Sequence, residues 1–208
     1  YHKRGSYASP TPVTDGKSVY FYFGAGGLYT YDFKGKLIWK RDMGKLGTIG
    51  LGPGTSPVLD GNLLFLQCDM EEGEGSHILA LDKRDGKQVW RTERKSMVTF
   101  STPVLNKTGS RTELITGANE NTIAYDAVTG KEIWRGPGLG GYSVPTHVMG
   151  HGMVYVNTGY PVKNTLAFKL GSEGAVKEVW TYKKGGAYIT STDWMTASWP
   201  ALMRRPAK

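Results

Sequence analysis

Cysteine is almost absent from this chain of 208 residues, which contains only Cys68. A single cysteine excludes an internal disulfide framework and a metal site built from several thiolates. Long apolar runs are missing too, and no stretch approaches the ~18 apolar residues that a membrane-spanning helix needs. The apolar period of about 3.6 residues that marks an amphipathic helix is not sustained anywhere. These absences argue against a disulfide scaffold, a helical membrane protein and a mainly helical fold.

Acidic residues are outnumbered by basic ones, 18 against 26, which gives a formal net charge of +8. A basic chain can bind a polyanion when its charges gather in one groove. Here lysines and arginines are scattered singly, often after a turn glycine, as at Lys36, Lys87 and Lys131. We therefore interpret the charge as a solvated surface and expect no nucleic-acid partner.

Tryptophan is present at a nearly constant interval, which is the main signal in the sequence. Four tryptophans are separated by 51, 44 and 46 residues. Ahead of the first three lies the same run, in which an Asp is followed by a Gly-Lys turn, then by two further residues and the Trp. The fourth run is degraded, with Lys169 where Asp is expected. The motif residues are Asp32, Gly35, Trp39, Asp82, Gly86, Trp90, Asp126, Gly130, Trp134 and Trp180.

A second recurring feature opens each unit, a proline preceded by Ser or Thr: Pro12, Pro57 and Pro103 directly follow one, and Pro145 follows Ser143 after one intervening residue. Proline lacks an N–H and is tolerated at the start or edge of a strand. Apolar runs rich in β-forming residues follow, for example over 19–23 and 153–156. The order of Pro, apolar run, Asp, Gly and Trp predicts four short strands in each unit.

The motif residues have local physical reasons to recur. An Asp side chain can accept hydrogen bonds from the turn backbone, and Gly adopts positive φ without Cβ strain. Trp supplies a large packing surface and one N–H group. We therefore predict structural rather than catalytic roles for the ten motif residues, with each Trp locking its unit onto a neighbour.

Four-stranded antiparallel units of ~40–50 residues stack radially into a β-propeller. The predicted all-β domain covers residues 1–192. Its blades span approximately 7–44, 53–97, 98–139 and 140–184, and a fifth blade begins at 186.

The Asp-x-x-(Thr/x)-Gly-Lys-x-x-Trp run resembles the tryptophan-docking motif of pyrroloquinoline-quinone (PQQ) repeats, and the resemblance extends to about Thr192. WD repeats would place a Trp-Asp pair at a strand end, and no such pair recurs at a constant position of the repeat in this sequence. Rings of the PQQ-repeat family have seven or eight blades. The resemblance therefore implies a fragment of a larger ring, with the missing blades of the same protein as one partner.

The last residues, 193–208, fit no phase of the repeat. A shift of the reading frame by two bases permits a string with an Asp-Ala-x-Thr-Gly-Lys turn like that of residues 126–131. One hypothesis is a frameshift near codon 193, and the alternative is a natural divergent tail. Arg204 and Arg205 are therefore given no functional role.

Candidate sites for chemistry have simpler explanations in this sequence. His147 and His151 are four residues apart but straddle a glycine turn, so they do not share a face and no metal site is predicted. The acidic run 69–74 lacks the spacing of a calcium loop, and we predict a solvated loop there. Residues 136–141 match Gly-x-Gly-x-x-Gly, but a strand start follows where a dinucleotide site requires a helix. No catalytic residue is predicted.

The resemblance implies three classes of function. The first is a non-catalytic, cofactor-free scaffold that binds a protein or carbohydrate partner in the periplasm or elsewhere outside the cytoplasm, as in the BamB-like branch; this segment itself contains no signal peptide. The second is a fragment of a dehydrogenase that uses PQQ and Ca²⁺. Many alcohol dehydrogenases of that kind carry adjacent cysteines, whereas Cys68 lies between Gln67 and Asp69. The third is the ligand-binding ectodomain of a sensor.

Overall fold

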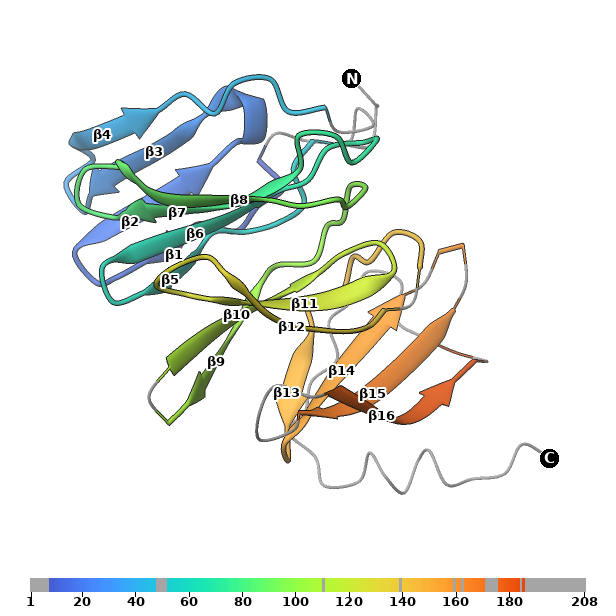
Figure 1. Ribbon diagram of the computed structural model, residues 1–208. Coiled ribbons are helices and arrows are strands. Elements are labelled where there is room, and N and C mark those ends of the chain that lie inside the picture. The colour runs from blue at the N-terminus through green and yellow to red at the C-terminus, as the bar shows by residue number, and fades with distance from the viewer. Residues whose placement is uncertain are drawn as a thin grey trace.

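The computed structural model describes residues 8–47, 52–109, 111–138, 140–158, 160–161, 163–170, 176–183 and 185. Within these residues the chain forms four antiparallel sheets of four strands and one short 3₁₀ turn at Gly24–Gly26. Figure 1 shows the sheets following one another in chain order, from blue to orange. The predicted all-β propeller fold is confirmed. The fifth blade predicted from 186 and the tail 193–208 lie outside the described residues.

Each sheet is a blade in which consecutive strands pair. Blade 1 contains β1 (Val13–Thr14), β2 (Ser18–Tyr22), β3 (Leu28–Asp32) and β4 (Leu37–Arg41). Blade 2 contains β5 (Val58–Asp60), β6 (Leu63–Cys68), β7 (His77–Asp82) and β8 (Gln88–Glu93). Blade 3 contains β9 (Val104–Thr108), β10 (Arg111–Gly117), β11 (Asn121–Asp126) and β12 (Glu132–Pro137). Blade 4 contains β13 (Val148–Gly150), β14 (Met153–Thr158), β15 (Asn164–Leu170) and β16 (Val176–Tyr182).

The core lies between successive blades, because neighbouring residues on a strand point to opposite faces. Leu64 and Leu66 of β6 pack with Tyr20 and Leu28 of blade 1. Phe65, which lies between them, packs with blade 3 instead. The central strands are therefore buried on both faces, which explains their continuous apolar runs.

Every blade has a β-bulge at the same place, the residue before the motif tryptophan. The register shifts so that Trp39, Trp90, Trp134 and Trp180 lie opposite Thr30, Ala80, Ala124 and Ala167. The residue skipped by the ladder is Ile38, Val89, Ile133 or Val179. A bulge adds a residue and re-aims the side chains that follow. The small residue across the ladder leaves room for the indole.

The starts of the first three blades are joined through the Ser and Thr residues that precede the prolines. The Thr11 amide donates to Ser56 Oγ at 2.9 Å, and the Ser56 amide donates to Thr102 Oγ1 at 3.0 Å. The corresponding residue in blade 4 is Val144, which has no hydroxyl to accept the next bond. This series of contacts therefore ends at blade 3.

A buried ion pair connects two loops of blade 2 and reaches blade 3, and it corrects one prediction. Asp69 is 5% exposed, so the acidic run 69–74 is not solvated along its whole length. Its carboxylate accepts two hydrogen bonds from Arg94, at 2.8 and 2.9 Å, and others from Gln67 and Thr99. Arg94 also donates to Thr116 Oγ1 at 2.6 Å and to the Gly117 carbonyl. The prediction failed because the partner lies 25 residues away in the sequence.

His147 and His151 lie at the two ends of β13 and do not straddle the turn between β13 and β14 as predicted. His151 lies in that turn, with a φ of 52°. His147 is 4% exposed, and neither ring nitrogen has a partner in hydrogen-bond geometry. Burial, together with the nearby Arg94 charge, lowers the pKa of His147 to about 4.

We expect the free energy of unfolding to fall as the pH drops from about 6.5 towards 4. The unfolded chain then binds a proton at His147, whose ordinary pKa is ~6.5, while the folded chain does not. The loss should reach about 3 kcal/mol, since each pKa unit is worth ~1.4 kcal/mol. Urea denaturation at several pH values measures it.

His147→Phe should flatten this pH dependence, whereas His151→Asn should leave it unchanged. Some slope should remain, because burial also lowers the pKa of His77. Equal slopes in the wild type and in His147→Phe would show that His147 does not titrate as its burial requires.

Candidate functional site

We call the contact between two successive blades a joint. The joint between blades 1 and 2 and the joint between blades 2 and 3 are built in the same way. Trp39 Nε1 of blade 1 donates to the Lys83 carbonyl of blade 2 at 3.0 Å, and Trp90 Nε1 donates to the Ala127 carbonyl of blade 3 at 3.0 Å. Each acceptor is the residue that follows a motif aspartate, Asp82 or Asp126.

Each indole also lies on the turn glycine of the next blade. A β-carbon on Gly86 would come within 2.7 Å of the Trp39 ring, and one on Gly130 within 2.5 Å of the Trp90 ring. Their φ angles are both 73°, so these glycines are required by conformation and by contact. The residue two positions after each Trp adds a bond, from Arg41 to the Gly86 carbonyl and from Thr92 to the Gly130 carbonyl.

The joint between blades 3 and 4 departs from this pattern. Trp134 Nε1 donates to Glu113 Oε2 at 3.3 Å, within its own blade. The acceptor turn depends on the motif aspartate: Asp126 Oδ1, for example, accepts from the amides of Val128 and Thr129. Lys169 takes the place of that aspartate in blade 4 and cannot accept such bonds. The indole N–H therefore bonds to a replacement acceptor, the Glu113 carboxylate.

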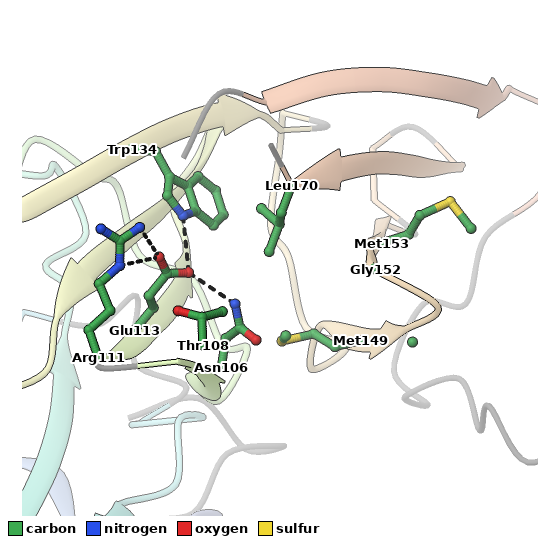
Figure 2. A pocket seen from close by; sticks show the side chains of 10 residues that line it. Asn106, Thr108, Arg111, Glu113, Trp134, Met149, Gly152, Met153 and Leu170 are labelled. Atoms are coloured by element: carbon green, nitrogen blue, oxygen red, sulfur yellow. Dashed lines mark hydrogen bonds and ion pairs between the residues drawn. The ribbon is translucent and has the colours of Figure 1, made fainter. Parts of the chain in front are cut away.

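A pocket of about 520 Å³ opens at this joint. Figure 2 shows Trp134, Arg111 and Glu113 of blade 3 on one side and Leu170, Met149 and Met153 of blade 4 on the other. Asn106, Thr108, Gly150 and Gly152 complete the lining. The pocket thus combines a polar wall from one blade with an apolar wall from the next.

Glu113 organises the polar wall. Its side chain is buried, and its Oε1 accepts from Arg111 at 2.7 and 3.0 Å, while its Oε2 also accepts from Asn106 at 3.0 Å. The Arg111 side chain is 40% exposed, so its guanidinium group is held by Glu113 and still reaches solvent. The wall therefore presents a positive group in a fixed orientation.

The other predicted motif residues lie where the repeat places them. Asp32 Oδ1 accepts from the amides of Lys34 and Lys36, both at 2.9 Å, and holds the turn that contains Gly35. Trp180 packs against Tyr155 with the rings tilted by 51° and their centroids 6.1 Å apart. Glu113, Arg111 and Asn106 were not among the residues predicted from the sequence to have a role. The available signal was the degraded fourth repeat, which leaves Trp134 without its usual acceptor.

A PQQ-repeat family model, described as outer membrane protein assembly factor BamB, matches residues 2–137 and, in an overlapping alignment, residues 74–193. The chain belongs to this BamB-like PQQ-repeat family. Overlapping matches are expected when one unit recurs along a chain. A search of curated proteins found no match.

Solved structures with the same fold include BamB and quinone enzymes. BamB from Moraxella catarrhalis superposes with a TM-score of 0.64 at 14% identity, covering 87% of this chain and 54% of BamB. Quinohemoprotein alcohol dehydrogenase from Comamonas testosteroni gives 0.62 at 17% identity, covering 87% of this chain and 36% of that enzyme. The corresponding enzyme from Pseudomonas putida HK5 gives 0.58 at 15% identity, covering 86% and 34%. The chain thus spans about half of BamB and about a third of the dehydrogenases, and the likeness concerns the fold.

The described residues do not fit a calcium–quinone centre. Calcium requires several free carboxylate or carbonyl oxygens. The two buried carboxylates, Asp69 and Glu113, are already engaged by protein donors. In the described part of the chain, no three His, Cys, Asp or Glu side chains converge. Across the same ranges no helix is long and apolar enough to cross a membrane.

Proposed function

We propose that this chain is part of a non-catalytic PQQ-repeat scaffold that binds a protein or carbohydrate partner outside the cytoplasm, without a cofactor. The observation that carries the proposal is the joint between blades 3 and 4. The two earlier joints repeat one arrangement, whereas this one replaces it and has a pocket of about 520 Å³. Departures from a consistent local pattern are expected at functional sites.

The lining of the pocket suits binding. Met149 and Met153 provide unbranched, polarisable side chains that adapt to the shape of a bound group. Arg111 is exposed and oriented by Glu113, and arginine is enriched among residues that dominate binding energy. The strands on both sides are rigid parts of the blades, so the pocket is formed before a partner arrives.

Family membership supports the location and the kind of partner. A BamB-like repeat protein is expected outside the cytoplasm, where an assembly factor of the outer membrane acts. The same membership favours a protein partner over a carbohydrate. The dehydrogenase fragment and the sensor ectodomain remain the alternative functions, and a titration with PQQ distinguishes the first of these.

A pair of β9 variants tests the pocket as the binding surface. Thr108→Trp places a bulky ring in the pocket, whereas Lys107→Trp places the same ring on the opposite face of the strand. We expect a partner captured from cell-envelope extract by the wild type to be retained by Lys107→Trp and reduced at least tenfold by Thr108→Trp. Equal retention by both variants would exclude the pocket as the binding surface.

The quinone arm of the test uses PQQ, Ca²⁺, a primary alcohol and an electron-accepting dye. A scaffold should give no quinone-dependent dye reduction. Reduction that requires PQQ would overturn the non-catalytic proposal in favour of the dehydrogenase.

A further inference from the structure

Asp-Gly dipeptides are places where a main chain can rearrange without an enzyme. The Gly amide nitrogen can attack the side-chain carboxyl carbon of the Asp, because Gly has no side chain that hinders the approach. The sequence contains three such dipeptides, which begin at Asp15, Asp60 and Asp85. We propose that the folded chain converts Asp60 to isoaspartate, whereas its structure protects Asp15 and Asp85. This inference is independent of the proposed function.

The rearrangement at Asp60 needs only water. The Gly61 nitrogen loses its proton to solvent and bonds to Asp60 Cγ, while a carboxyl oxygen leaves as water and a succinimide ring closes. Water then adds to one of the two ring carbonyls and breaks its bond to the Gly61 nitrogen. Opening at the side-chain carbonyl restores aspartate, whereas opening at the main-chain carbonyl leaves the chain running through Cβ and Cγ. One water leaves and one returns, so the product is an isomer of the starting chain.

The hairpin between β5 and β6 leaves the attacking nitrogen free. Asp60 pairs with Leu63, so the loop between these strands has only two residues. Gly61, the first of them, is exposed and has a φ of 54°. Its amide donates no hydrogen bond to any residue that the structure describes. A β-carbon on Gly61 would meet no atom within 4 Å, so no neighbour blocks the approach of the carboxyl group.

The Asp60 carboxylate is held by a single weak contact. Within the described ranges its only partner is Lys107 Nζ, at 2.7 Å. The Lys107 side chain is 69% exposed, and solvated ion pairs of this kind contribute little to stability. The carboxyl group can therefore leave Lys107, take up a proton and turn towards the Gly61 nitrogen.

The dipeptide at Asp15 is protected at both reacting groups. The Gly16 amide donates to Thr14 Oγ1 at 3.1 Å. The Asp15 carboxylate accepts from the amides of residues 17 and 18, from the Tyr20 hydroxyl and from Lys83 Nζ at 2.8 Å. The bond from Lys83 holds the pKa of Asp15 well below its usual range. The carboxylate thus stays ionised, and an ionised carboxylate is a poor electrophile.

The dipeptide at Asp85 is protected by the joint between blades 1 and 2. The Gly86 amide donates to the Asp82 carbonyl at 2.8 Å, and Gly86 is buried beneath the Trp39 ring. The Asp85 carboxylate accepts from both the amide and the Nζ of Lys87, and the side-chain bond lowers the pKa of Asp85. The turn therefore cannot open without separating the two blades.

Conversion of Asp60 would change a contact between blades 2 and 3. The main chain gains one carbon in the hairpin, and the free carboxylate moves from Cγ to the α-carbon position. Lys107, which lies in β9 of blade 3, then loses the partner that it has in β5 of blade 2. Isoaspartate is also recognised by protein isoaspartate methyltransferase, which methylates its carboxylate, so the modified site can be labelled.

Peptide mapping of the aged 208-residue chain tests the proposal. One sample is kept folded at mildly acidic pH, and another is kept unfolded in guanidinium chloride until all three dipeptides have begun to convert. Electron-transfer fragmentation distinguishes isoaspartate from aspartate at each position. We expect similar rates at the three sites in the unfolded chain, and in the folded chain a rate at Asp60 at least tenfold above those at Asp15 and Asp85.

A matched pair of variants checks the assignment by methylation. Glutamate does not form this ring readily, so Asp60→Glu should remove most of the label that isoaspartate methyltransferase transfers to the aged folded chain. Asp85→Glu makes the same change in an exposed turn and should leave the label unchanged. Equal rates at the three sites of the folded chain would overturn the proposal. So would an unconverted Asp60 in the folded chain, or full labelling of Asp60→Glu.

Discussion

Replacing Trp134 by Ala is expected to lower the free energy of unfolding by about 3–5 kcal/mol, the usual loss for a large buried aromatic. The side chain is 5% exposed and packs edge-on against Phe168 of blade 4, with ring centroids 5.8 Å apart. Its removal leaves a cavity between two blades and takes one donor from the Glu113 carboxylate. Urea denaturation of the wild type and the variant measures the loss, provided that the free energy of unfolding has the same dependence on urea concentration in both.

A second variant separates packing from hydrogen bonding. Trp134→Phe keeps an aromatic ring between the blades but removes the N–H group that Glu113 accepts, so it should cost only about 1–2 kcal/mol. A loss below about 1 kcal/mol for Trp134→Ala would contradict the role of this side chain in holding blades 3 and 4 together.

Arg94→Leu is expected to cost about 3–5 kcal/mol, because it leaves the Asp69 carboxylate buried without its counter-ion. Both side chains are at most 2% exposed, and Arg94 also bonds to Thr116 and Gly117 of blade 3. The change therefore weakens blade 2 and its contact with blade 3 together. Thermal or urea unfolding measures it.

The exposed pair Lys107–Asp60, 2.7 Å apart, provides the matched control for this effect. Lys107→Ala should cost less than about 1 kcal/mol, as is usual for solvated ion pairs. Asp69→Asn combined with Arg94→Leu should cost less than the sum of the single changes, because no unpaired charge remains. Two results would contradict a tightly coupled buried pair. The first is a double variant whose loss of stability equals the sum of the two single losses, and the second is an equal loss for Arg94→Leu and Lys107→Ala.

The repeat and the all-β fold could be predicted from sequence because their signals are local. Proline at a strand start, Asp and Gly in a turn and Trp four residues after that Gly each act within a few positions of the chain. The bulge was not predicted, although it fixes where each Trp points, since an extra residue such as Ile38 is defined only by its partner strand.

The polar wall of the pocket and the buried ion pair could not be predicted for a related reason. Glu113 lies 21 residues from Trp134, and Asp69 lies 25 residues from Arg94. Neither pair follows a period, and each is brought together only by the pairing of strands within its own blade, blade 3 for the first and blade 2 for the second. The sequence did indicate where regularity fails, at Lys169, and the pocket lies at that joint.

Because every regular joint has its donor and acceptor in the same order along the chain, repeat units can be gained or lost without disturbing the remaining joints. In a regular unit the Trp indole N–H is the donor to the next blade, and the carbonyl after the motif Asp is the acceptor for the blade before. When such a unit is inserted or removed, the blades that become neighbours therefore still present a donor opposite an acceptor. Duplication of a whole blade therefore needs no compensating change elsewhere. The fourth unit has lost this interchangeability on one side: Lys169 replaces its motif aspartate, and the tryptophan of the blade ahead of it bonds to Glu113 of its own blade instead.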